Sequence, residues 1–185
     1  DVSKREEVNE SNSKSVKKLL TYATLCCDGS IVIEGKKEKH IGDPTETAIV
    51  KGYVNQGQDF EKLMARNKRY GEIPFDSDRK MMSVIVPSDK KDYKYMLIVK
   101  GAPDKIFRHL ENSRDNQLAK ARLVNEHFGN NALRVLAVAV KYLDELPTNL
   151  KSNNIETKLT LIGLIGIMDP PKVEAKVSVK ELREA

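Results

Sequence analysis

Hydrophobic and polar residues alternate with the two-residue period of a β-strand in three stretches of the chain, which are residues 79–86, 93–99 and 132–143. In or directly after each stretch, a basic residue shares a face with hydrophobic residues and lies at the end of that face. These basic residues are Lys80, Lys100 and Arg134. Three cations at the ends of three apolar faces favour a ligand that has both a phosphate group and an apolar part. Solvated strand ends, whose basic head groups reach water, are the alternative.

The first two of these strands are expected to form an antiparallel hairpin, because the polar residues 87–92 between them form a turn. In the register in which paired residue numbers sum to 180, Lys80 lies directly opposite Lys100, although other registers are open. Like charges that face each other destabilise a sheet, so an anion between the two lysines would explain the pair better. Gly101 then leaves space for the close approach of a backbone, and Pro103 suits the first turn of a helix.

Helical periodicity predicts amphipathic helices around these strands. They cover residues 15–27 and 113–128, and two further helices are expected at residues 59–66 and 172–183. Another helix is expected to begin with Asp43 as N-cap, Pro44 in its first turn and Glu46 in a capping box. Further strands are expected at residues 31–33, 69–75 and 158–168, with polar loops at 36–39 and 144–157. The whole pattern predicts an α/β domain.

The composition is typical of a soluble globular domain with a mildly basic surface. Of the 185 residues, 39% are hydrophobic and 32% are charged, and the net charge of +5 favours an anionic ligand without requiring nucleic acid. Aromatic residues make up only 5% of the chain, so a base-stacking surface for nucleic acid is poorly supported. The longest apolar stretch, residues 159–168, is too short to span a bilayer.

Cysteine, histidine and acidic residues do not indicate a disulfide or a metal site. Cys26 and Cys27 are neighbours on a predicted helix, so a structural disulfide is not expected and a reducing compartment fits. The three histidines lack the spacing of metal ligands. The segment 76–78 (DSD) lacks the glycine and the closing glutamate of a calcium loop, and its aspartates are expected to cap a turn.

Five short motifs follow one another along the chain. They are GDPTETA (42–48), PFDSDRKMMS (74–83), KGAPD (100–104), ALRVLA (132–137) and GIMDPPK (166–172). Together they closely resemble the nucleotide-binding domain of calcium-type (type II) P-type cation pumps, and the resemblance extends over nearly the whole chain. It implies a largely antiparallel, twisted sheet with helices packed against it.

The resemblance also implies an ATP site. Phe75 would stack on the adenine, and Glu46, beside Thr45, would lie near the adenine amino group. Cations and apolar side chains from the strand ends would form the rest of the pocket: Lys80, Lys100, Gly101, Met82 and Leu136 as its wall and Arg134 at the phosphates. Two alternatives are that Phe75 belongs to the ordinary core and that Glu46 serves only the capping box. Where animal calcium pumps carry an arginine, this chain has Ser77, so one phosphate contact is missing or supplied elsewhere.

The resemblance further suggests that the chain is one domain of a larger pump. Residues 1–10 are expected to be a hinge remnant, 11–165 the nucleotide-binding domain, and 166–185 a hinge and the start of the phosphorylation domain. The phosphorylated DKTGT segment is absent from the sequence. The chain should therefore bind ATP or ADP as a monomer on the cytoplasmic side of the membrane, without contacting the membrane or nucleic acid. Phosphorylation and actuator domains would be its partners, and Mg²⁺ would act with the phosphorylation domain.

A basic interaction module that binds RNA or acidic partners is the alternative function. The position of the cations at strand ends, instead of along one face, argues against it.

Overall fold

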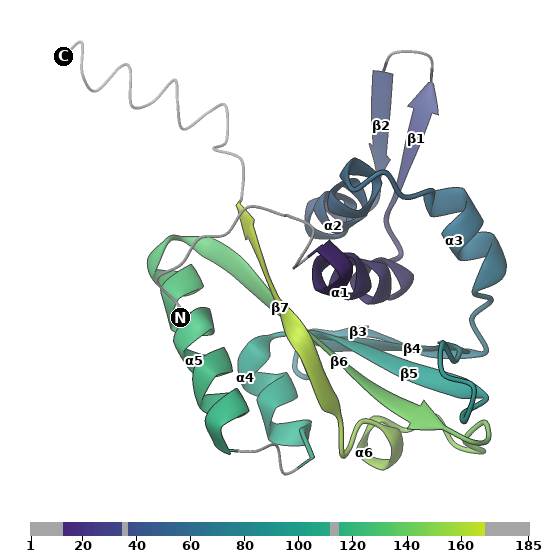
Figure 1. Cartoon of the computed structure of the whole chain (residues 1–185), viewed down its shortest axis with the longest axis vertical. Helices are drawn as coiled ribbons and strands as arrows, with labels where there is room; N and C mark the ends of the chain where they lie inside the picture. The colour runs from purple at the N-terminus through teal and green to yellow at the C-terminus, as the bar shows by residue number, and fades with distance from the viewer. Residues whose placement is uncertain (1–12, 35–36, 112–114, 169–185) are drawn as a thin grey trace.

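The centre of the molecule is a five-stranded sheet in which every strand is antiparallel to its neighbours (Figure 1). The computed structural model describes residues 13–34, 37–111 and 115–168. The strands, in spatial as well as chain order, are β3 (Gly71–Asp76), β4 (Met81–Pro87), β5 (Tyr95–Gly101), β6 (Leu133–Leu143) and β7 (Thr160–Met168). The prediction of a largely antiparallel sheet with packed helices is confirmed.

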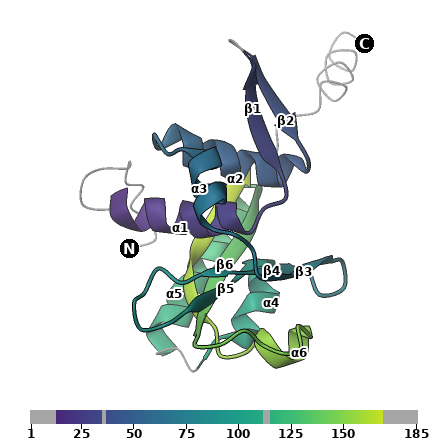
Figure 2. The same ribbon diagram turned by 90° about the vertical axis from the view of Figure 1, so that its right-hand side faces the viewer.

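Helices cover both faces of this sheet and give the molecule three layers (Figure 2). On one side lie α1 (Ser13–Leu25), α2 (Pro44–Asn55) and α3 (Phe60–Arg66), together with a hairpin of β1 (Ser30–Glu34) and β2 (Lys37–Ile41). On the other side lie α4 (Pro103–Ile106), a 3₁₀ turn (Phe107–His109), α5 (Asp115–Asn130) and α6 (Ser152–Ile155). The site described below lies between the first layer and the sheet.

The period of the strands decides which residues face which layer. Even-numbered residues of the central strands pack against α1 and α2, and these include Met82, Val84, Val86, Met96, Ile98, Val138 and Val140. Odd-numbered residues pack toward α4 and α6, and these include Met81, Ile85, Leu97, Val99, Ala137 and Ala139. Because both faces are buried, the strands read as nearly continuous hydrophobic runs.

Most predicted elements are present with boundaries shifted by a few residues. The helices predicted at 15–27, 59–66 and 113–128 correspond to α1, α3 and α5, and the predicted strands to β1 and β3–β7. The predicted loop at 36–39 is wrong, because residues 37–41 pair with β1 through their backbones. The predicted loop at 144–157 is wrong in part, since it contains α6 and the fully buried Glu156. The helix predicted at 172–183 lies outside the described residues.

The register of the β4–β5 hairpin differs from the predicted one by two residues. Paired numbers sum to 182, so Met82 faces Lys100 and Val84 faces Ile98. The turn takes up residues through Lys94, whose carbonyl oxygen accepts a hydrogen bond from the Ser88 amide at 3.1 Å. A shift of two residues leaves every side chain on its predicted face.

Candidate functional site

A cavity of about 750 Å³ lies between the start of α2 and one end of the sheet. At this end β3, β5 and β7 finish while β4 and β6 begin, and residues of β3, β4, β5 and β6 line the cavity. The nine residues predicted for the nucleotide site all line this cavity: Thr45, Glu46, Phe75, Lys80, Met82, Lys100, Gly101, Arg134 and Leu136. The fold thereby brings Arg134 into contact with Thr45, which lies 89 positions earlier in the chain.

Lys80 reaches the cavity from a tight turn instead of from a strand. Its backbone has a positive φ of 54°, which non-glycine residues rarely adopt. The turn is closed by Asp76, whose carbonyl oxygen accepts from the Lys80 amide at 2.6 Å and whose carboxylate accepts from the amides of Asp78 and Arg79. The prediction that this aspartate caps a turn is confirmed. The predicted Lys80–Lys100 pair is wrong, because the chain at Lys80 is not extended.

Lys100 is buried, with 5% of its surface exposed, so it is not a solvated strand end. Its ammonium group contacts the Glu46 carboxylate at 2.7 Å and the Cys27 sulfur at 3.2 Å. Burial alone would lower the pKa of Lys100. The sulfur atoms of Cys27 and Cys26 and the Glu46 carboxylate more than offset this, and the pKa lies above the usual lysine value. Lys100 is therefore a cation at neutral pH.

Glu46 connects three parts of the cavity wall. One carboxylate oxygen contacts Lys100, while the other accepts hydrogen bonds from the backbone amides of Asp28 and Gly29, both at 2.8 Å. The predicted capping box is therefore wrong for Glu46, whose carboxylate is engaged by distant residues. Asp43 alone caps α2 with its side chain, accepting from the amides of Thr45 and Glu46.

Arg134 projects into the cavity from the start of β6. Its Nη1 atom donates to the Thr45 hydroxyl at 2.8 Å, which ties the strand to the first turn of α2. Arg134 is an exposed residue, as is Lys80, which lines the same cavity. Within the described ranges, Lys80 forms no ion pair. The cavity thus presents at least one cation that is available to an anionic ligand.

Phe75 is the most exposed aromatic side chain among the described residues, with 64% of its surface accessible. A core phenylalanine would be buried, so the alternative interpretation of Phe75 is wrong. The ring lines the cavity together with Ser77, which lies in the turn after β3. An exposed ring beside a cavity can stack on a flat ligand.

The floor of the cavity is apolar and close-packed. Met82 is 2% exposed and packs into the core beside the partly buried Leu136. At Gly101 a side chain would collide with β4, since an added Cβ atom would lie 2.4 Å from the Lys80 carbonyl oxygen. The expectation of a close backbone approach at Gly101 is therefore confirmed, and the approaching backbone is that of β4.

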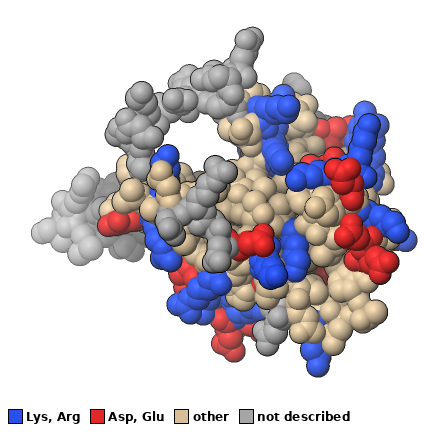
Figure 3. All heavy atoms as spheres, turned by 60° about the horizontal axis from the view of Figure 1, so that its bottom comes forward, with Lys and Arg blue, Asp and Glu red and all other residues tan. Residues whose placement is uncertain are grey.

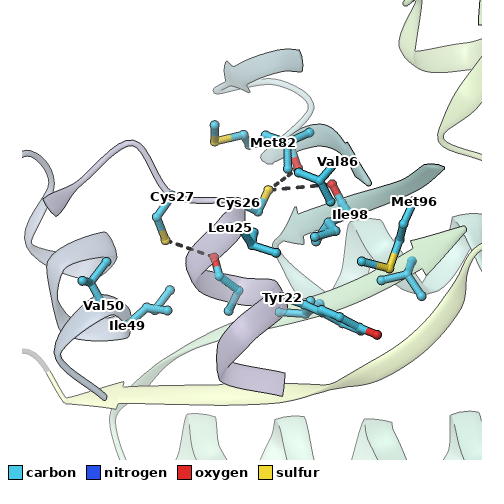
Figure 4. Packing of buried hydrophobic residues seen from close by; sticks show 14 of the residues in the cluster. Tyr22, Leu25, Cys26, Cys27, Ile49, Val50, Met82, Val86, Met96 and Ile98 are labelled. Atoms are coloured by element: carbon cyan, nitrogen blue, oxygen red, sulfur yellow. Dashed lines mark hydrogen bonds between the residues drawn. The ribbon is translucent and has the colours of Figure 1, made fainter. Parts of the chain in front are cut away.

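The two cysteines lie under this floor as free thiols (Figure 4). Cys26 points to the carbonyl oxygens of Met82 and Ile98, at 3.5 and 3.8 Å, and Cys27 donates to the Ala23 carbonyl oxygen at 3.2 Å. Burial raises the pKa of Cys26 to about 12 and that of Cys27 to about 11. Both are thus protonated at neutral pH.

Several residues of the site were not predicted from the sequence. The cavity is also lined by Asp28, Gly29, Gly42, Asp43, Ser77, Ala102 and Val135. Gly42 has a positive φ of 104° and lies against Gly29, where an added Cβ atom would be 2.9 Å from the Gly29 Cα atom. Asp28 and Gly29 contribute backbone amides, which no side-chain pattern could reveal, whereas Gly42 and Asp43 lie in the GDPTETA motif.

On the face that Figure 3 shows, lysine and arginine side chains are interspersed with acidic ones instead of forming one continuous basic stripe. Across the described ranges, no three His, Cys, Asp or Glu side chains are grouped as metal ligands. No helix in this part of the chain has both the length and the apolarity of a membrane span.

The chain matches a protein-family model described as "P-type ATPase, cytoplasmic domain N" over residues 15–174. It is 35% identical to a calcium-transporting ATPase of Listeria monocytogenes and 33% identical to one of Bacillus subtilis, in each case over 97% of this chain and 21% of the relative. A calcium-transporting ATPase of Lactococcus lactis is 34% identical over the same shares. The chain therefore spans about a fifth of the length of these relatives.

Proposed function

Because the chain belongs to the cytoplasmic N domains of P-type ATPases, we propose that it binds ATP in the cavity between α2 and the sheet and presents the γ-phosphate to an aspartate on another domain. The observation that carries this proposal is the convergence on one cavity of an exposed aromatic ring, an apolar floor and basic side chains. These are the three features that an adenine ring and a polyphosphate chain require.

Each group has a distinct role in this proposal. The adenine stacks on Phe75 above Met82 and Leu136. Its amino group donates to Glu46, whose carboxylate is already held in place by the Asp28 and Gly29 amides. Lys100 fixes the same carboxylate from the other side.

The phosphates lie toward the exposed cations. Lys80 reaches the cavity from the turn before β4 and Arg134 from the start of β6, and both contribute positive charge there. Thr45 orients Arg134 through its hydroxyl group. Ser77, which replaces the arginine of animal calcium pumps, can offer the phosphates a hydroxyl group but no charge.

The described residues do not fit a magnesium site of their own, since no acidic cluster is present among them. We assign Mg²⁺ to the ATP phosphates and to the phosphorylation domain of the parent pump. The phosphorylation and actuator domains are the proposed partners, and cation transport is the proposed activity of the whole protein. The domain itself is proposed to act as a monomer.

Calorimetric titration of the chain with ATP, with GTP as control, tests this proposal. ATP should bind with one site per chain, and Lys80→Ala should bind it more weakly than Lys94→Ala, which removes an exposed lysine outside the cavity. An RNA oligonucleotide should bind weakly and lose affinity steeply with added salt. RNA binding with no detectable ATP binding would support the basic interaction module instead.

A further inference from the structure

The segment that carries Phe75 leaves the regular β-ladder. Ile73 pairs with Ser83 and Asp76 pairs with Met81, and the register shifts between these two pairs. The intervening Pro74 has no N–H group to donate to a neighbouring strand, which is typical of edge strands and bulges. Phe75 itself is mostly exposed, so core packing does not fix its ring. The direction of this ring therefore depends on how the bulge is held.

One side chain holds the bulge from outside the cavity. The Nη2 atom of Arg79 donates to the Pro74 carbonyl oxygen at 2.6 Å, and its Nη1 atom donates to Glu156 at 2.5 Å. The planar fork of a guanidinium group can make both bonds at once, whereas a lysine ammonium group cannot reproduce that geometry. Arg79 is itself largely buried, with 15% of its side chain exposed.

Glu156, the partner of Arg79, is held in a constrained position. It lies between α6 and β7, and its side chain is fully buried. The Ser83 hydroxyl of β4 donates to the same carboxylate oxygen that accepts from Arg79. A buried carboxylate needs such partners to remain charged, so the group cannot move away without a large cost.

We propose that Arg79 and Glu156 act as an anchor that positions Phe75 for the adenine ring. Arg79 connects Glu156, in the segment before β7, to the Pro74 carbonyl oxygen in the β3 bulge. Neither Arg79 nor Glu156 lines the cavity. Arg79 and Glu156 are thus positioning residues that act through Phe75, not ligand contacts. This inference rests on the proposed function, in which Phe75 stacks on adenine.

The first test compares nucleotide affinity in a double-mutant cycle. Arg79→Lys and Glu156→Gln should each weaken ATP binding about two- to tenfold, since apparent affinity falls with the fraction of molecules whose ring is correctly placed. The loss should be the same for ATP, ADP and AMP, and should not exceed that of Phe75→Ala. In a Phe75→Ala background the two substitutions should have almost no further effect. Arg122→Lys makes the same chemical change over the Phe107 ring, away from the cavity, and serves as control.

The second test needs no nucleotide. The sequence contains no tryptophan, so Phe75→Trp introduces a single fluorophore at the relevant ring position. Adding Arg79→Lys to this variant should speed the decay of tryptophan anisotropy, whereas adding Arg122→Lys should leave it unchanged. Glu156→Gln should have the same effect as Arg79→Lys, and it provides the measurement if Arg79→Lys does not fold.

The outcomes separate this inference from the function on which it rests. If the parent chain binds no ATP, the proposed function fails and the inference fails with it. If the parent binds ATP and the anchor variants bind it equally well, only the inference is wrong. The inference is also wrong if the variants lose affinity to the same extent with and without Phe75, because their effect would then be a general loosening of the domain.

Discussion

Replacing Phe75 by alanine separates a ligand-stacking ring from a structural one. Phe75 is 64% exposed, so the burial of its side chain contributes little to the stability of the domain. Full burial of a phenylalanine stabilises a protein by about 1.5–3 kcal/mol, and the buried third of Phe75 should contribute roughly 0.5–1 kcal/mol. Stacking on adenine is worth about 1–3 kcal/mol, so ATP affinity should fall roughly 5- to 150-fold.

Thermal unfolding and calorimetric titration on the same samples measure both quantities. Phe107→Ala is the matched control, because that ring is only 6% exposed and lies outside the cavity. It should lose about 3–5 kcal/mol of stability, with unchanged ATP affinity in its folded fraction. Phe75 has no stacking role if Phe75→Ala is as unstable as this control while its folded fraction binds ATP like the parent.

Four further predictions concern the lysines, the thiols and metal. Lys80→Gly and Lys80→Ala should both bind ATP more weakly than the parent chain. The glycine variant should be more stable than the alanine variant by about 1 kcal/mol, because glycine adopts the positive φ of this position freely. Equal unfolding curves for the two variants would contradict this prediction. Lys100→Ala should lower stability by about 3 kcal/mol as well as ATP affinity, since it leaves Glu46 without its buried partner, and a parent-like unfolding curve would be inconsistent with that pair. Burial raises the pKa of Cys26 to about 12 and that of Cys27 to about 11, so the thiols ionise at lower pH in the unfolded chain, at about pH 8.5. The free energy of unfolding should therefore be fully present below about pH 8.5 and decrease as the pH rises toward 11. Urea titrations that give the same free energy of unfolding at both ends of this range would refute this prediction. Removal of divalent metal with EDTA should leave ATP affinity unchanged, because the described residues form no metal site, and a clear loss would show that a metal contributes to binding.

Residues on strands were placed well from the sequence because alternation fixes the face of a strand without fixing its register. Met82, Leu136 and Arg134 reached the cavity as predicted, and a register error of two residues in the hairpin did not change this. The predicted pairing of Lys80 with Lys100 was wrong, because the position of Lys80 depends on a left-handed turn that periodicity cannot show.

Contacts between distant segments could not be predicted in this way. Glu46 follows Asp43 at the spacing of a capping box, yet its carboxylate binds Lys100 and two backbone amides, because these groups become neighbours only after folding. Glu156 lies in a polar stretch and is nevertheless fully buried, since Arg79 and Ser83 satisfy its charge. The β2 strand was missed because its described side chains are exposed, so only backbone pairing defines it.

Tryptophan fluorescence of the Phe75→Trp variant gives the most direct test of nucleotide binding at this cavity. The parent sequence has no tryptophan, and Tyr70→Trp offers a control at a ring that is 47% exposed and does not line the cavity. We predict that ATP and AMP change the fluorescence of Phe75→Trp in a saturable way, that tripolyphosphate does not, and that none of them affects Tyr70→Trp. A folded Phe75→Trp variant whose fluorescence is unchanged by millimolar ATP would contradict the account.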